Sequence, residues 1–414
     1  MDRKRVVITG MGVIAPSGIG LKTFWDSLVN GRSGIRKITR FNAVSYASQI
    51  AGEVKGFDPL DYMSAKSVRR MDRFSQFAVA CVRMALDDSR LEITHDNSDK
   101  VGIALGSALG GFPMAEEQYA IFMEKGLKRV DPLLAIKPFS GGSASQVSIE
   151  FGIRGYSNTI GGGCAVGSDS VGYAFHMIKN NLAEVVVTGA SEAPIAPLTF
   201  GAFSLIGALS KKNSDPTTAS RPFDKERDGF VMSEGAAAFI LEDLHHALGR
   251  NAPIYAEILG YGTTNDGYHM VQPSPTGEQA KRAIQMALLE ANMESEEIDY
   301  INAHGSSTPL NDNIETKVIK EVFGEHAYEI PVSSIKSMIG HCLGAAGSIE
   351  IVASVLTIRN QFIPPTINYE FPDPECDLDY VPNQGRKASV KTILTNSYGF
   401  GGKNSAIIVR EFLP

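Results

Sequence analysis

The chain has 414 residues, 43% hydrophobic and 21% charged, with a formal net charge of −7. This composition is typical of a globular protein with a sizeable core, built as two or three domains or two closely packed halves. No block of basic residues indicates binding to nucleic acid or to a membrane surface. No run of about 18 apolar residues could span a bilayer.

The cysteines and the N-terminus indicate the compartment. The four cysteines lie far apart without a CxxC pair, which argues against a structural zinc site and fits a reducing environment. The opening "MDRKRVVITG" lacks the apolar stretch of a signal peptide. We therefore expect a cytoplasmic protein without a metal site.

Short apolar runs typical of buried strands alternate with segments of helical period along the first half of the chain. Segment 72–91 gathers its apolar side chains on one helical face, and the residues after Cys164 also have helical spacing. Strands are predicted at residues 5–10, 101–106, 184–190 and 237–242.

The second half repeats this plan. Strands are predicted at 255–262, 298–305, 392–397 and 405–411, and helices at 278–292 and 347–360. Alternating strands and helices predict α/β layers. The stretch "HHALGRNAPI" reads as a helix end, a turn and a new strand. We therefore expect an N-terminal half at 1–250 and a C-terminal half at 251–414, sharing one packed core.

The first strand is followed by a G-x-G-x-x-A pattern at Gly10, Gly12 and Ala15. Such a pattern can bind a dinucleotide. Here Pro16 stands where a crossover helix should be established, and no strand ending in an acidic residue follows at the expected distance. We interpret the glycines as a tight turn after the first strand and expect no nicotinamide cofactor.

The stretch "GGGCAVGSDSVG" (161–172) raises the question of whether Cys164 is a nucleophile. Glycines let the backbone turn sharply and approach a ligand closely. The positive end of a following helix favours the thiolate form of a cysteine. A free cysteine is also commonly a small buried residue. This stretch by itself leaves both interpretations open.

Three further motifs place polar side chains at strand ends, where α/β sheets bind ligands. They are His304 in "NAHGSSTPLND", Lys336 and His341 in "SSIKSMIGHCLGAAGS", and the glycine-dense loop "NSYGFGGKN" (396–404). A cysteine with two histidines suits thiol acyl transfer, either hydrolytic or condensing. The second histidine favours condensation, because two neutral imidazoles can each donate an N–H to an enolate oxygen.

Together with "SRPFDKERDGFVMSEGAAAFILE" (220–242), these motifs resemble the β-ketoacyl-carrier-protein synthases of the thiolase superfamily, over essentially the whole chain. The resemblance implies a five-layered αβαβα sandwich of two similar α/β halves, active as a dimer. The stretches "GCAVGSDSVGYA" (163–174) and "PDPECDLDYVP" (372–382) look like the catalytic α subunit of type II aromatic polyketide synthases. That subunit pairs with a chain-length factor that lacks the cysteine.

The resemblance implies a decarboxylative Claisen condensation without a tightly bound cofactor. Cys164 would take an acyl or polyketide chain from the phosphopantetheine arm of an acyl carrier protein. His304 and His341 would hold the carbonyl oxygen of a malonyl thioester while carbon dioxide leaves. Lys336 would support His341 and the local field.

Further residues match supporting positions of the family. The backbone N–H groups of Cys164 and Phe400 would form an oxyanion hole, and Phe400 would act as a gate. Glu315 would support the histidines by hydrogen bonding. Ser306 and Thr308 match positions that contact the pantetheine arm.

The chain departs from the family pattern in three places. Gly162-Gly163 replaces the usual pair before the cysteine, and Lys403 stands where a small residue is common. Gly207 occupies a position where relatives often carry an arginine that grips the carrier. Positive charge for an acidic carrier could come instead from five residues that could equally be ordinary solvated surface: Lys66, Arg69, Arg70, Lys211 and Lys212.

Three alternatives stay open. The nearest is a homodimeric 3-oxoacyl-carrier-protein synthase II of fatty-acid elongation. A non-condensing scaffold or chain-length partner is disfavoured because Cys164, His304, Lys336 and His341 are all present. A non-condensing thiol hydrolase is the remote alternative.

Overall fold

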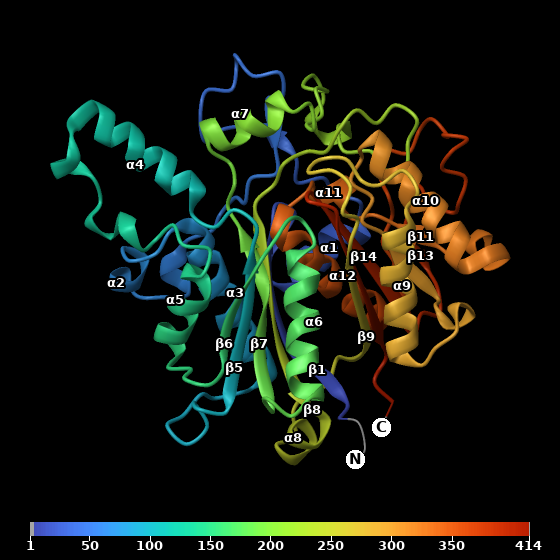
Figure 1. Ribbon diagram of the computed structural model, residues 1–414, viewed down its shortest axis with the longest axis horizontal. Coiled ribbons are helices and arrows are strands. Elements are labelled where there is room, and N and C mark those ends of the chain that lie inside the picture. The colour runs from blue at the N-terminus through green and yellow to red at the C-terminus, as the bar shows by residue number, and fades with distance from the viewer. Residues whose placement is uncertain (1–3, 414) are drawn as a thin grey trace.

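The computed structural model describes residues 4–413, which form a five-layered αβαβα sandwich (Figure 1). Two mixed sheets lie on either side of a central layer made by helices α6 (Val166–Lys179) and α12 (Ala346–Asn360). Helices α3 (Arg73–Ser89) and α5 (Gly142–Phe151) cover the outer face of one sheet. Helices α9 (Glu278–Ala291) and α10 (Pro309–Phe323) lie on the outer side of the other.

The first half supplies one sheet, whose strands precede residue 250. They are β1 (Val6–Ala15), β5 (Val101–Ser107), β6 (Ser157–Gly161), β7 (Val185–Glu192) and β8 (Gly235–Asp243). The shorter helices of this half are α1 (Leu21–Val29), α2 (Ala65–Val68), α4 (Phe112–Lys125), α7 (Pro197–Leu205) and α8 (Leu244–Gly249).

The second half supplies the other sheet. Its strands are β9 (Ala256–Asn265), β10 (Tyr300–Asn302), β11 (Val332–Ser333), β14 (Thr392–Gly399) and β15 (Lys403–Arg410). A short helix, α11 (Lys336–Ile339), follows β11. Some short strands do not belong to the strand order that the two main sheets share. They are β2 (Gly18–Ile19), β3 (Arg36–Lys37), β4 (Ile50–Ala51), β12 (Phe362–Ile363) and β13 (Arg386–Lys387).

The two sheets repeat the same strand order. In the first half the order is β6-β5-β7-β8-β1, and in the second it is β11-β10-β14-β15-β9. Numbered by appearance within its half, each reads third, second, fourth, fifth, first. In both sheets the first three strands of this order are parallel to one another, and the last two strand pairings are antiparallel. A short antiparallel pairing of β1 with β9 joins the sheets.

The largest hydrophobic cluster of the described residues lies between the two sheets, and two further clusters lie on their outer faces. Helix α12 is buried along nearly all of its length, as expected for a helix that is apolar on every side. Its side chains pack with those of α6 and with the inner faces of both sheets. Because this layer is shared, the halves are held as one body. Among the helices of residues 4–413, none is long and apolar enough to cross a membrane.

The interpretation of Gly10 and Gly12 as a turn was wrong. Both lie inside β1, which continues to Ala15. A Cβ at Gly10 would lie 2.2 Å from the Ala85 carbonyl oxygen, and one at Gly12 would lie 2.1 Å from that of Cys81. The glycines are therefore needed because α3 packs directly on the strand backbone.

The second half uses the same device. In β9, a Cβ at Gly260 would lie 2.1 Å from the Ala287 carbonyl oxygen, and one at Gly262 would lie 2.0 Å from that of Ala283. Both carbonyls belong to α9. Strand and helix thus approach equally closely in the two halves.

Candidate active site

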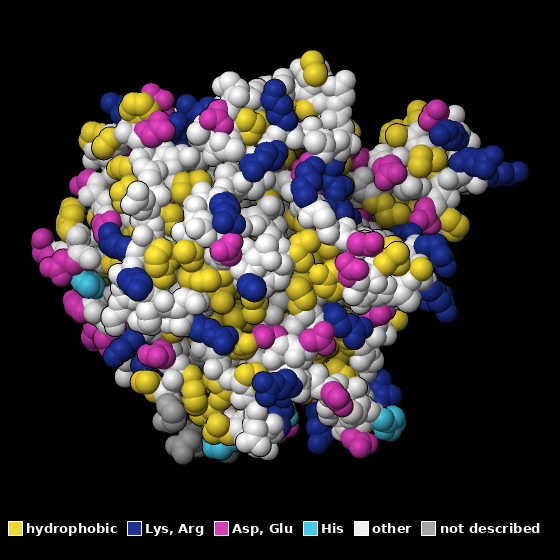
Figure 2. All heavy atoms as spheres, turned by 180° about the vertical axis from the view of Figure 1, so that it is seen from behind, with side chains coloured by type: hydrophobic (Ala, Val, Ile, Leu, Met, Phe, Trp, Pro, Cys, Tyr) yellow, Lys and Arg dark blue, Asp and Glu magenta, His cyan; other side chains and the backbone are white. Residues whose placement is uncertain are grey.

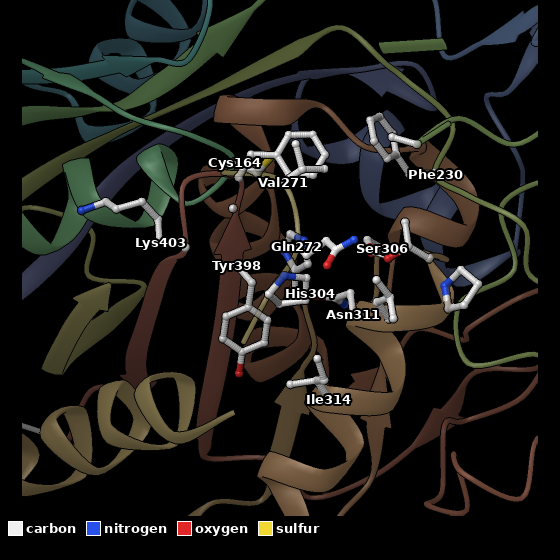
Figure 3. A pocket seen from close by; sticks show the side chains of 18 of the residues that line it. Cys164, Phe230, Val271, Gln272, His304, Ser306, Asn311, Ile314, Tyr398 and Lys403 are labelled. Atoms are coloured by element: carbon white, nitrogen blue, oxygen red, sulfur yellow. Dashed lines mark hydrogen bonds between the residues drawn. The ribbon is translucent and has the colours of Figure 1, made fainter. Parts of the chain in front are cut away.

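The motif residues meet at the carboxyl ends of the parallel strands of both sheets. Cys164 follows β6, His304 follows β10, and Lys336 and His341 lie between β11 and α12. Phe400 belongs to the hairpin turn between β14 and β15, residues 399–403, here named the Phe400 turn. Cys164, both histidines and Phe400 line one cavity of about 290 Å³ (Figure 3).

Cys164 is 7% exposed and lies just before the start of α6. It packs in an apolar cluster whose members include Phe200, Phe230 and Leu343. Burial raises the pKa of the Cys164 thiol to about 11, although a hydrogen bond from the Phe400 backbone N–H and the charge of Lys336 act in the other direction. The start of a helix was expected to favour the thiolate. In the resting protein, burial has the larger effect on the pKa and favours the thiol.

The glycines around Cys164 allow two backbones to touch. A Cβ at Gly163 would lie 2.6 Å from the Phe400 carbonyl oxygen, and one at Gly399 would lie 2.6 Å from the Cys164 amide nitrogen. Gly163 is therefore explained by the approach of the Phe400 turn. At Gly162 a Cβ would meet only Val166 at 3.5 Å and Lys403 at 3.9 Å, so packing does not require glycine there.

His304 is held from its backbone side. Glu315 of α10 accepts the backbone N–H of His304 at 2.8 Å and that of Gly305 at 2.7 Å. The carboxyl group is completely buried, which raises the pKa of Glu315 to about 7 despite these two bonds. Glu315 therefore orders the loop that carries His304 and does not itself line the cavity.

Lys336 fixes the protonation pattern of the His304 ring. Its Nζ donates to the His304 carbonyl oxygen at 2.6 Å and lies 3.4 Å from His304 Nδ1. Since an ammonium group can only donate, Nδ1 accepts and the ring proton is placed on Nε2. Lys336 is buried and paired with Glu350 of α12.

Lys336 was expected to support His341, but its ammonium group hydrogen-bonds to His304. It affects His341 through its charge, which helps to lower the pKa of that ring. The reason is the position of Glu350, which draws the ammonium group under the His304 loop.

His341 faces His304 across the cavity. The two ring centroids are 5.2 Å apart at an interplanar angle of 82°, and the Phe230 ring lies 5.2 Å from His341 on another side. The backbone N–H of His341 donates to the Val231 carbonyl oxygen at 2.7 Å. Within residues 4–413, His341 Nδ1 has no hydrogen-bond partner.

Both rings are neutral. Burial, the Lys336 charge and the neighbouring His341 hold the pKa of His304 well below its usual value, and burial with Lys336 does the same for His341. Neutral imidazoles each carry one N–H donor. Two such donors beside a thiol can stabilise a negative oxygen that develops between them.

Ser306 and Thr308 line the same cavity, and their hydroxyl oxygens are 2.9 Å apart. Gln272 and Asn311 also line this cavity, and both are drawn with Ser306 in Figure 3. The side chain of Phe400 stacks on Phe203, with centroids 6.2 Å apart and planes 18° from parallel. This stack lies beside Cys164 in the apolar cluster.

Two functional features were missed in the sequence. Strand β6, which delivers Cys164, reads "SNTIG" and is an edge strand with mostly exposed or half-buried residues, so it lacks an apolar pattern. Glu350 was overlooked as the partner of Lys336. A lone carboxylate inside the apolar run "GSIEIVASVL" was the available signal, because a buried charge requires a partner.

The possible carrier-contact residues stand apart from the cavity. Lys66, Arg69, Arg70 and Lys211 are exposed and Lys212 is half-buried, and none lines the cavity. Gly207, where relatives often have arginine, has a φ of 73° and follows α7. That left-handed backbone favours glycine at this position.

No group of three or more His, Cys, Asp or Glu side chains suited to a metal ion occurs among residues 4–413.

Comparisons with known proteins agree along the whole chain. Residues 3–247 match the beta-ketoacyl synthase N-terminal domain, and residues 255–370 match its C-terminal domain. The 3-oxoacyl-[acyl-carrier-protein] synthase 2 of Synechocystis sp. is 46% identical over 100% of this chain and 99% of its own. That of Coxiella burnetii is 45% identical, covering 99% of both chains.

Solved structures give the same result. A type II polyketide synthase ketosynthase, solved with its acyl-carrier protein and bound to a hexaketide, has a TM-score of 0.92 at 37% identity, covering 99% of this chain and 100% of that one. The ishigamide ketosynthase/chain length factor has a TM-score of 0.93 at 36% identity with the same coverage. The chain therefore belongs to the β-ketoacyl synthase family and is a β-ketoacyl-carrier-protein synthase, an acyltransferase that joins its substrates by decarboxylative condensation.

Proposed function

We propose that this enzyme elongates acyl chains in the manner of the 3-oxoacyl-[acyl-carrier-protein] synthase 2 relatives, using malonyl groups on an acyl carrier protein. The observation that carries this proposal is the 45% to 46% identity to those relatives over the whole chain, against 36% to 37% for the polyketide ketosynthases. These relatives favour the elongation synthase over the polyketide α subunit that the motifs around Cys164 resemble.

In the first step the Cys164 sulfur attacks the thioester carbonyl of an acyl-carrier protein. The carbon–sulfur bond to the pantetheine arm breaks, and that thiol leaves with the proton of Cys164. The backbone N–H groups of Cys164 and Phe400 stabilise the oxyanion that forms. Support comes from the backbone N–H of Phe400, which acts on the Cys164 thiol to lower its pKa.

In the second step a malonyl thioester binds with its carbonyl oxygen between His304 and His341. Its carbon–carboxylate bond breaks, carbon dioxide leaves, and the electron pair forms an enolate. The Nε2–H of His304 and the N–H of His341 stabilise that oxygen. Their neutrality supports this assignment, because each ring keeps one donor for the enolate.

In the third step the enolate carbon attacks the acyl thioester on Cys164. The new carbon–carbon bond forms, the sulfur leaves as a thiolate, and it takes up one proton. The β-ketoacyl product remains on the carrier protein. Ser306 and Thr308 contact the pantetheine arm during both half-reactions, an assignment supported by their place in the wall of the cavity that Cys164 also lines.

The partner protein in the assembly is a second copy of this chain under this proposal. Helix α4 projects from the body, and its lobe carries hydrophobic side chains on its surface (Figure 2). Tyr119, Met123 and Leu127 are 63%, 66% and 74% exposed. Such an apolar lobe is typical of a subunit interface. A chain-length factor could cover the same lobe in a heterodimer.

A polyketide ketosynthase α subunit is the second candidate. Two polyketide ketosynthase structures cover 99% of this chain with TM-scores of 0.92 and 0.93. The residues after Cys164, "AVGSDSVGYA", also resemble that branch. In this case the chain condenses poly-β-ketone intermediates with a chain-length factor as its partner.

Reconstitution separates the two candidates. The purified chain is incubated with acyl-carrier and malonyl-carrier proteins, without any other ketosynthase, and the products are identified by mass. One round of elongation of saturated acyl chains by a homodimer supports the elongation enzyme. Activity that requires a cysteine-free homologue, with a poly-β-ketone product, supports the polyketide candidate.

Substitutions at the site test the chemistry itself. Cys164→Ala should abolish acyl loading from acyl-carrier protein, measured as the covalent adduct by intact mass. His304→Ala and His341→Ala should impair carbon dioxide release from malonyl-carrier protein by about 100-fold or more, and affect acyl loading less. An adduct that persists in Cys164→Ala, or unchanged carbon dioxide release in both histidine variants, would refute these assignments.

A further inference from the structure

Lys403, one of the departures from the family pattern, is the last residue of the Phe400 turn and the first residue of β15. It pairs with Gly399 at the end of the β14–β15 hairpin. Its Nζ lies 3.6 Å from Asp169 Oδ2, and its side chain is 34% exposed, against 6% for Asp169. In Figure 3 its side chain extends away from His304 and Ser306. The lysine therefore reaches sideways from the turn, towards α6.

Asp169 is a fixed anchor for this contact. It belongs to the first turn of α6, the helix that begins directly after the Cys164 loop. Its Oδ1 accepts the Tyr261 hydroxyl at 2.8 Å. The Tyr261 ring sits against Gly172, where a Cβ would lie 2.3 Å from the ring. The carboxylate thus has little freedom to follow the lysine.

The hydrogen bonds of Gly401 and Gly402 tie the Phe400 turn to the second half of the molecule, whereas its contacts with the first half include the Phe400–Phe203 ring stack and the close approach to the Cys164 loop. The Gly401 N–H donates to the Met270 carbonyl at 2.8 Å, and Asp266 N–H donates to the Gly402 carbonyl at 2.8 Å. Both glycines have left-handed backbones, with φ of 81° and 73°. Such a turn adapts readily, because glycine has few steric limits.

We propose that the Lys403–Asp169 ion pair is a positioning contact that holds the Phe400 turn against the start of α6. The two oxyanion donors belong to different halves of the molecule, so their separation depends on contacts between the halves. Lys403 connects the turn that carries one donor to the helix that follows the other. This inference rests on the proposed role of the Phe400 N–H in acyl transfer.

A different role would give Lys403 to the substrate. Lys403 lines the cavity wall beside Gly402 and is partly exposed, so its charge could attract the phosphate of a pantetheine arm. That role predicts weaker carrier binding when the charge is removed. The positioning role predicts a looser turn even without substrate. The two are therefore distinguishable.

The first test is hydrogen–deuterium exchange of peptides covering 396–404 in the full-length protein without substrate. Lys403→Met keeps the aliphatic stem without the charge, and Asp169→Asn keeps an acceptor for Tyr261. Each should exchange about two- to fivefold faster, as expected for a partly exposed ion pair. Lys403→Arg should stay near wild type, and peptides of β7 serve as the internal reference.

Lys281→Met is the matched control. Lys281 of α9 is 33% exposed and forms a surface ion pair at 3.2 Å with Glu321 of α10, which does not involve residues 396–404. It should leave exchange of 396–404 unchanged. Unchanged exchange in Lys403→Met would overturn the proposal.

The second test separates kcat from KM in acyl loading. Lys403→Met and Asp169→Asn should lower kcat by similar factors, with KM for the carrier protein unchanged. The double variant should lose no more than either single one, because both remove the same contact. A higher KM with normal exchange would assign Lys403 to the carrier and overturn the proposal. If Lys403→Met exchanges faster at 396–404 but the wild-type protein has no condensing activity, the positioning contact stands and the proposed function is refuted.

Discussion

Burial sets the state of each reactive side chain in the pocket. The Cys164 thiol is protonated at rest because its pKa is raised to about 11. The rings of His304 and His341 are neutral because their pKa values are held well below the usual value. The resting cavity therefore presents a thiol and two neutral N–H donors, and negative charge develops there only when a substrate reacts.

The raised pKa of Cys164 predicts how the thiol responds to an alkylating agent. Because the thiolate is the reactive form, the alkylation rate by iodoacetamide should rise about tenfold per pH unit between pH 7 and pH 9. Intact mass and peptide mapping follow the modification at Cys164. A rate that levels off below pH 8 would contradict the dominance of burial over the Phe400 N–H and the Lys336 charge.

The buried pair of Lys336 and Glu350 predicts a large cost when one partner is removed. Glu350→Gln leaves the ammonium group without its carboxylate and should lower the free energy of unfolding by about 3–5 kcal/mol. Urea unfolding measures this change. The control is Glu321→Gln, whose surface pair with Lys281 should be worth less than about 1 kcal/mol. Similar losses in the two variants would contradict the expected effect of burial.

At the scale of elements, close approach of backbones explains several glycines. Gly10 and Gly12 let α3 pack on β1, and Gly163 lets the Phe400 turn touch the Cys164 loop. In each case the atom that a Cβ would meet is a backbone oxygen, which cannot move without its strand or helix. A Cβ at Gly162 would instead meet the side chains of Val166 and Lys403 at ordinary contact distances.

Gly163→Ala and Gly162→Ala form a matched pair for testing this. A methyl group at Gly163 should displace the Phe400 carbonyl and slow acyl loading by about tenfold, through partial loss of an oxyanion donor. At Gly162 the same change should stay within about twofold, since the nearest atoms are at ordinary contact distance. Loading rates come from intact mass. Wild-type loading by Gly163→Ala would contradict the close approach.

The sequence predicted elements where the pattern was strong. The helices at 72–91, 278–292 and 347–360 correspond to α3, α9 and α12 within a few residues. β6 was missed because an edge strand needs no apolar face. The Gly10 pattern was misinterpreted because a turn and a close helix contact demand the same residue type.

The site could be assembled from the sequence only through its motifs. Cys164, His304, Lys336, His341 and Phe400 meet around one region of the fold, as expected from their places at strand ends. The protonation of His304 and the partner of Lys336 could not be predicted, because they depend on a contact between segments far apart in the chain. The catalytic roles themselves stay predictions.

At the scale of the whole molecule, we propose the division into residues 1–250 and 251–414 and find a clear link between them. Glu290 of α9 accepts from Lys179 at 2.7 Å and lies 3.0 Å from the His176 ring, both on α6. It also accepts the Tyr261 N–H of β9 at 3.1 Å. One carboxylate thus ties the central helix to the second half.

This link predicts a dependence of stability on pH. The partners of Glu290 outweigh its burial and lower its pKa to about 2, below the ordinary 4.5. Its contribution is therefore present above about pH 4.5 and is lost as the pH falls towards 2. Glu290→Gln should lower the free energy of unfolding at pH 7 by about 1–2 kcal/mol, discounted for partial exposure.

Urea unfolding between pH 7 and pH 3 measures the Glu290 effect. The difference between variant and wild type should shrink below pH 4.5. Glu325→Gln, at an exposed site, is the control and should show a small difference at every pH. A constant difference for Glu290→Gln across the range would contradict the linkage.

The repeated strand order has a consequence for how activity can arise. Cys164 lies between the third strand of its sheet and the helix that follows, and Lys336 and His341 lie at the equivalent connection of the other sheet. The nucleophile and its electrophilic helpers are thus counterparts in a duplicated plan. Neither half can therefore be active when it is expressed separately. If mixing the fragments 1–250 and 251–414 restores turnover, the two halves have assembled correctly.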